Sequence, residues 1–153
     1  MPDKSPKTYL FDGATLHVAL SGDAAGGSVA ILDAVVPPGA GSAPHSHARE
    51  EETGLVLEGA LQIETRGETF SVSAGQAMSL PRNVPHRLSN VTGETTHVLL
   101  ICTPAGLDRF VEEIGHPVTE NKPISSTITP EVMRHVDEVS RRFGISIVNE
   151  AAL

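Results

Sequence analysis

The segment from Gly39 to Gly59, GAGSAPHSHAREEETGLVLEG, constrains the fold of this chain more than any other. His45 and His47 are one residue apart, so both side chains would point to the same face of a strand. Glu52 returns to that point if the chain turns within HAREEE and a second strand begins at ETGLVLEG. Two imidazoles and a carboxylate are ligands that a divalent first-row metal accepts. The segment therefore predicts a metal site between two strands, with a further ligand supplied from elsewhere.

Turn residues and short apolar runs favour a mainly β fold over a helical bundle. Glycine occurs 14 times and proline 11 times, whereas aromatic residues make up only 3% of the chain. About nine short strands separated by turn residues fit the chain up to residue 103. Short strands at this spacing are typical of a barrel or a sandwich.

After residue 104 the apolar positions repeat with a helical period. We expect one short helix over 107–114 and a second after the N-cap Thr129, joined by a tether over 116–128. The second helix has an apolar stripe that should lie on the barrel wall or on a partner subunit: Val132, Met133, Val136 and Val139. One domain is expected, with N-terminal strands in 1–27, a barrel core in 28–103 and a helical extension in 104–153 packing on the barrel.

The charge balance narrows the range of partners. Eleven basic and 19 acidic residues give a formal net charge of −8, and no basic cluster is present. Nucleic acid and anionic membranes are therefore poor candidates as partners. The sequence has neither a signal-peptide pattern nor an apolar run long enough to span a membrane, so we expect a cytoplasmic protein. Cys102, the only cysteine, lies in an apolar run and is expected to be a buried, inert thiol.

A second histidine motif occurs in GQAMSLPRNVPHRLSN, where Gly75, Pro81, Asn83, His86 and Asn90 follow one another at fixed spacing. Together with the first motif, this pattern resembles the two motifs of the cupin superfamily, and in particular small single-barrel cupins of the quercetin-dioxygenase type. The resemblance covers residues 28–103 most closely. It implies a jelly-roll barrel, also called a double-stranded β-helix, with a metal held inside one end.

The resemblance also implies the ligand set. His45, His47, Glu52 and His86 would hold one divalent ion, and Fe, Mn, Ni, Co and Zn all suit three imidazoles and a carboxylate. Glu51 is a rival ligand by spacing, but only Glu52 stands six residues before the motif glycine. Asn83 replaces the glycine that is usual in the family, so this position is expected to have a positive φ, which asparagine tolerates.

The chemistry at the metal is less constrained. Many cupins carry an aromatic residue just after the ligand glutamate, whereas Thr53 and small or aliphatic residues follow here, which disfavours a tyrosine-assisted mechanism. Glu52 could act as a base as well as a ligand. Arg49, Glu50 and Glu51 are expected at the solvent-exposed rim. The predicted substrate pocket consists of Leu55, Met78, Leu88, His97 and Phe110, with His97 able to face either the cavity or solvent.

Several functions fit this interpretation. The first is a mononuclear metal-dependent oxygenase, of dioxygenase type, acting on a small organic molecule. Isomerases, cyclases and decarboxylases use the same ligands, and a non-catalytic cupin that binds a small ligand is a further alternative. A homodimer is also expected, because the helix stripe and an exposed edge strand near Tyr9 would offer a dimer surface.

Overall fold

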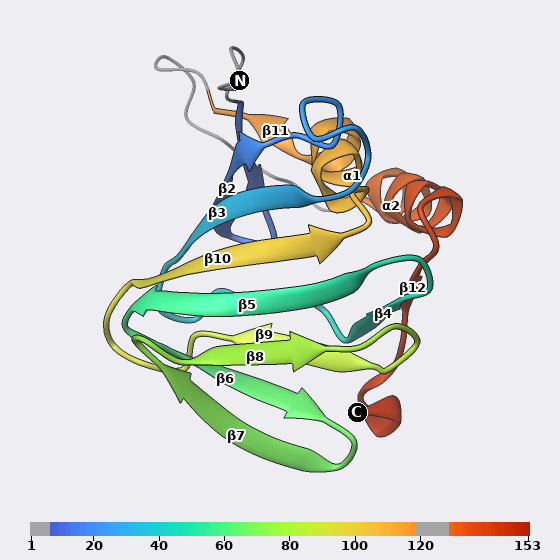
Figure 1. Ribbon diagram of the computed structural model, residues 1–153. Helices are drawn as coiled ribbons and strands as arrows, with labels where there is room; N and C mark the ends of the chain where they lie inside the picture. The colour runs from blue at the N-terminus through green and yellow to red at the C-terminus, as the bar shows by residue number, and fades with distance from the viewer. Residues whose placement is uncertain (1–6, 119–128) are drawn as a thin grey trace.

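The computed structural model describes residues 7–118 and 129–153, which form two antiparallel β-sheets and a pair of helices (Figure 1). One sheet has the order β11-β1-β2-β3-β10-β5-β8, and the other has the order β12-β4-β9-β6-β7. The strands of the first sheet, in that order, are His116–Pro117, Thr8–Phe11, Ala14–Leu20, Ala30–Val36, Thr96–Thr103, Glu51–Glu58 and Ala77–Leu80. Those of the second are Ile145–Ile147, His45–His47, His86–Ser89, Ala60–Thr65 and Glu68–Ser73. The mainly β barrel expected from the sequence is confirmed.

The core lies between the two sheets and follows the alternation of each strand. In β3, for example, Ala30, Leu32 and Ala34 are buried while the residues between them are not. The turn between β5 and β6 joins the two sheets and requires a glycine. Gly59 has a φ of 78°, and a Cβ there would lie 2.6 Å from the hydroxyl oxygen of Thr96. Any larger residue would have to displace this close contact.

Two helices, α1 (Leu107–Ile114) and α2 (Pro130–Arg142), lie together at one end of the barrel (Figure 1). The N-cap of α2 is as expected, since the Thr129 side chain accepts a hydrogen bond from the backbone N–H of Val132. Phe110 of α1 packs edge-on between Phe11 and Phe143, with ring centroids 5.7 and 5.8 Å away. These rings attach the helical end to the barrel.

The C-terminal part of the chain differs from the expected helical extension in two places. His116 and Pro117, expected in a tether, form β11 and pair with β1. Ile145–Ile147 forms β12, which pairs with β4 and so lies beside the first histidine motif; a one-turn 3₁₀ helix, Glu150–Ala152, follows. Such short strands carry too few residues for a period-two pattern to stand out in the sequence. The remainder of the expected tether, 119–128, and residues 1–6 of the N-terminal part lie outside the described residues.

The surface features that suggested a dimer are arranged differently from the expectation. β1 is not an exposed edge, because β11 covers it, and the Tyr9 side chain is 4% exposed. Only the C-terminal end of the α2 stripe packs on the barrel: Val139 is fully buried, whereas Val132 and Met133 are 43% and 58% exposed. No helix in the described ranges is both long and apolar enough to cross a membrane.

Candidate metal centre

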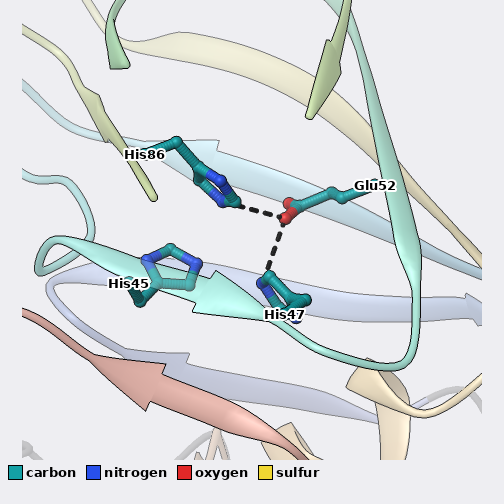
Figure 2. Close-up of side chains that lie close together, drawn as sticks. All are labelled: His45, His47, Glu52 and His86. Atoms are coloured by element: carbon teal, nitrogen blue, oxygen red, sulfur yellow. Dashed lines mark ion pairs between the residues drawn. The ribbon is translucent and has the colours of Figure 1, made fainter. Parts of the chain in front are cut away.

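Four side chains from three strands converge inside the barrel (Figure 2). β4 contributes His45 and His47, β5 contributes Glu52, and β9 contributes His86. His45 and His86 face each other across the β4–β9 pair, which brings the two motifs together. One ligand atom from each of the four lies within 4.8 Å of the others. We call these four residues the histidine–glutamate cluster.

The ring nitrogens of the cluster are oriented by their surroundings. Nδ1 of His45 lies 2.7 Å from the carbonyl oxygen of Ala43, and Nδ1 of His86 lies 3.0 Å from that of Val84. A carbonyl oxygen only accepts, so these contacts place the proton on Nδ1 and leave Nε2 with its lone pair. Ligand histidines of metal sites are oriented in this way.

The cluster fits a metal ion better than it fits a hydrogen-bond network. Oε2 of Glu52 lies 3.2 Å from Nε2 of His47 and 3.5 Å from Nε2 of His86, the contacts drawn in Figure 2. None of these three buried atoms has a well-aligned hydrogen-bond partner. Such groups are costly to bury unpaired. Donors around one ion at about 2.0–2.2 Å are at most about 4.4 Å apart, so shifts of a few tenths of an ångström would complete the site.

Glu50 is a residue of this centre that the sequence interpretation missed. It was expected at the solvent-exposed rim, but it is 2% exposed and its Oε1 lies 3.4 Å from Nδ1 of His47. The neighbouring Glu51 does lie at the surface, 3.3 Å from the Arg82 side chain, and Arg49 is exposed as expected. The separation of three residues between His47 and Glu50 is the one sequence signal that could have revealed the contact.

We expect Glu50→Gln to weaken metal binding by roughly 10- to 100-fold, because a carboxylate 3.4 Å from Nδ1 of His47 would stabilise the proton on that nitrogen and make the imidazole a better ligand. The dissociation constant is measured by competition with a chromogenic chelator. Glu51→Gln is the matched control, since it removes the same charge from an exposed site one residue away. Equal losses in both variants would assign the effect to net charge and contradict a positioning role for Glu50.

The pKa values within the metal-free cluster are displaced in opposite directions. Burial and the neighbouring His86 lower the pKa of His45 to about 4. Burial also opposes protonation of His47, but Glu50 and Glu52 outweigh it and raise its pKa to about 9. Burial would raise the pKa of Glu52, yet His47 and His86 outweigh it and hold that pKa well below its usual range. The metal-free site is therefore expected to keep Glu52 ionised and His47 protonated at neutral pH.

These displacements predict that the metal-free protein is most stable near pH 6.5 and loses stability on both sides. The raised pKa of His47 stabilises the fold below its usual value of 6.5, and this contribution is lost as the pH rises to about 9. The lowered pKa of His45 removes stability as the pH falls from 6.5 to about 4. Urea unfolding in EDTA between pH 4 and 10 measures the profile. A constant free energy of unfolding from pH 6.5 to 9 would contradict it.

A backbone hydrogen bond from the second motif supports β4, the strand that carries His45 and His47. Asn83 has a φ of 60°, as expected for a residue that replaces glycine, and its N–H donates a 2.7 Å hydrogen bond to the carbonyl oxygen of His47. The turn before His86 therefore holds β4 in place. Cys102 is fully buried, and burial together with the charge of Glu52 raises its pKa, as expected for an inert thiol.

An apolar cavity of about 120 Å³ adjoins the cluster, and His45, His47 and Glu52 form part of its wall. Of the five predicted pocket residues, Leu88 and Phe110 line this cavity. The structure places the other three elsewhere.

His97, Leu55 and Met78 are absent from the cavity wall for different reasons. His97 pairs with Asp33 on the outer face of the first sheet, where both are about one-third exposed. Leu55 lies on the opposite face of β5 from the buried Gly54 and Val56. Met78 is buried, but its side chain covers Gly54. A one-residue change of phase along a strand moves a side chain to the other face, which explains the first two differences.

Comparison with known proteins gives a family-model match and curated relatives. Residues 32–102 match the family model described as the cupin domain. A Streptomyces cyaneus protein named polyketide synthase CurC is 32% identical over 95 residues, 62% of this chain and 60% of that protein. The chain thus spans about 60% of the length of the curated relatives it matches.

Two solved structures have a similar fold. That of KdgF from Halomonas sp. is 22% identical, with a TM-score of 0.58 over 65% of this chain and 86% of that one. A sugar phosphate isomerase of the cupin superfamily from Silicibacter pomeroyi is 25% identical, with a TM-score of 0.55 over 62% of each chain. The two-sheet architecture of this chain agrees with the fold of these structures.

Proposed function

We propose that this chain, whose residues 32–102 match the family model described as the cupin domain, is a cupin and a mononuclear metal-dependent enzyme acting on a small organic molecule. An oxygenase of dioxygenase type is the first candidate. The observation that carries the proposal is the position of the cluster in the wall of the apolar cavity. A molecule bound there lies directly against the side chains that would hold the metal. The relative named as a polyketide synthase supports an organic substrate, and the lining of the cavity supports one that is largely apolar.

Each residue of the site has a role in this proposal. His45, His47, Glu52 and His86 would hold one divalent ion, and their chemistry suits Fe, Mn, Ni, Co and Zn alike. When bound, the ion supplies Lewis-acid activation of an oxygen donor on the substrate and, in the case of iron, reactivity toward dioxygen. Glu52 is the carboxylate that belongs to both the cluster and the cavity wall, so it would be the group that accepts a substrate proton. The apolar walls exclude water and strengthen these electrostatic interactions.

A proton-transfer reaction is the second candidate, as in an isomerase, cyclase or decarboxylase. Two observations favour it: the carboxylate of Glu52 in the cavity wall and the likeness to a structure named as a sugar phosphate isomerase. This reaction needs no dioxygen. The two candidate reactions therefore differ in whether dioxygen is a cosubstrate, whereas the residues that would hold the metal are the same in both.

The test compares Fe(II)-loaded with metal-free protein on 4-methylcatechol, acetylacetone and 3-hydroxyflavone. Dioxygen uptake coupled to loss of the organic substrate, in the loaded protein alone, is the expected result for an oxygenase. Exchange of a substrate C–H for deuterium under nitrogen supports the second candidate instead. Ligands that raise the melting temperature without any conversion would overturn the enzymatic proposal in favour of a binding protein.

We also propose that the chain assembles as a homodimer. Each copy would bind one small molecule at its own site. The exposed Val132 and Met133 on α2 support an apolar contact between copies. Sedimentation that finds only a 16.1 kDa species would contradict the dimer.

A further inference from the structure

Most of the side chains that line the cavity beside the cluster are apolar. Apolar side chains from both sheets and from α1 form most of its surface, including Leu16, Val36, Leu61, Leu88, Val98 and Phe110. Apart from the cluster, the polar side chains that line it are those of Asp12 and Ser42. Neither lysine nor arginine occurs among the described residues of the wall. Outside the cluster, a ligand in this cavity therefore finds no cationic side chain among the described residues of the wall to pair with an anionic group.

The mouth of the cavity can be located from the exposure of its lining residues. Asp12, in the turn between β1 and β2, is exposed, and Ile147 of β12 is 48% exposed. Phe110 and Leu61, by contrast, are 3% and 1% exposed. The cavity thus opens between the β1–β2 turn and β12. A carboxylate stands at each end of the path, Asp12 at the mouth and Glu52 at the cluster.

The volume of the cavity limits the size of its ligand. An apolar cavity of about 150 Å³ in a protein core accommodates a molecule the size of benzene. The cavity here measures about 120 Å³. The enclosed part of a ligand is therefore about the size of one six-membered ring.

This inference rests on the proposed function: we infer that the substrate is an uncharged molecule whose enclosed part is the size of a single ring and is apolar except for oxygen donors at the end facing the cluster. A carboxylate or phosphate elsewhere on the molecule would lose its hydration without gaining a cationic partner, and it would meet the carboxylate of Asp12. Sugar phosphates and dicarboxylates are thereby excluded. The neighbouring structure named as a sugar phosphate isomerase thus shares the barrel with this chain but not the substrate class.

The test compares two catechols that differ only at the ring position remote from the metal-binding oxygens. 4-Methylcatechol carries a methyl group there and 3,4-dihydroxybenzoate a carboxylate. Calorimetry on zinc-loaded protein under nitrogen measures both affinities without turnover, since zinc has no redox chemistry. We expect 4-methylcatechol to bind on the order of 100-fold more tightly, and ribose 5-phosphate not to compete with it.

A second test places a positive charge at the mouth of the cavity and measures the change in catechol affinity. Ile147→Lys is expected to strengthen binding of 3,4-dihydroxybenzoate relative to that of 4-methylcatechol by about tenfold. Leu57→Lys is the matched control, because it adds the same charge at a residue of similar exposure on β5 that is outside the cavity wall. Equal or tighter binding of 3,4-dihydroxybenzoate by the unmodified protein would overturn the substrate class, as would failure of zinc-loaded protein to bind either catechol. Failure to retain zinc, measured before any catechol is added, would instead overturn the proposed function.

Discussion

A chain carrying His86→Ala is expected to bind its divalent metal on the order of 100- to 1,000-fold more weakly than the unmodified chain. Four-ligand sites in small proteins bind zinc with about 10–16 kcal/mol, so each ligand contributes roughly 3 kcal/mol. His86 is fully buried, and no other described histidine outside the cluster is close enough to replace it. The metal content of purified protein, followed by chelator competition, measures the loss. His45→Ala is expected to give the same result, because both imidazoles belong to one site.

His97→Ala serves as the control for these variants. It also removes an imidazole, but from the outer face of the first sheet, where His97 pairs with Asp33. Its metal content should equal that of the unmodified chain. Unchanged metal content in His86→Ala and His45→Ala would contradict the assignment of the cluster as a metal site.

Phe110→Ala is expected to lower the free energy of unfolding of the metal-free protein by about 3–5 kcal/mol. The ring is 3% exposed and packs between Phe11 and Phe143, so its removal leaves a void where α1 meets the barrel. A loss of this size is a large part of the 5–15 kcal/mol that stabilises a typical domain. Urea unfolding monitored by circular dichroism measures the change.

Phe70→Ala is the matched control for this prediction. It removes the same ring from β7, where Phe70 is 40% exposed, so we expect a loss below about 1 kcal/mol. Because Phe110 also lines the cavity, its removal should enlarge the space beside the cluster. Equal losses in the two variants would mean that the helical end contributes little to the stability of the barrel.

The parts of this structure that could be predicted from sequence are those in which spacing determines geometry. His45 and His47 share a strand face because side chains alternate, and the distance to Gly59 selected Glu52 over Glu51. Asn83 could be assigned a positive φ because the resemblance to the cupin motifs places a glycine at this position, and asparagine tolerates the left-handed region. The shared face of His45 and His47 depends on local backbone geometry alone, whereas Glu52 and Asn83 were also assigned through the resemblance to the cupin motifs.

The other parts depend on contacts between distant segments. Glu50 belongs to a charged run that usually faces solvent, and only the path of the chain around His47 brings it inside. The phase of His97 could not be read from a strand that is apolar on both faces. The cavity, likewise, is lined by residues of α1 and of both sheets, including β12, so no single segment of the sequence predicts it.

Because β12 pairs with β4, the metal centre is completed only after the C-terminal strand has been synthesised. Ile145 lies opposite His47, yet it follows His47 by roughly a hundred residues, which a ribosome takes about 5–20 s to synthesise. During that interval the strand that carries two of the ligands lacks its neighbour on one side. A nascent chain therefore passes through a stage in which its histidines are present but not yet held in register. Metal that arrives during this stage meets flexible ligands, and selection among metal ions by a rigid site begins only once the last strand has docked.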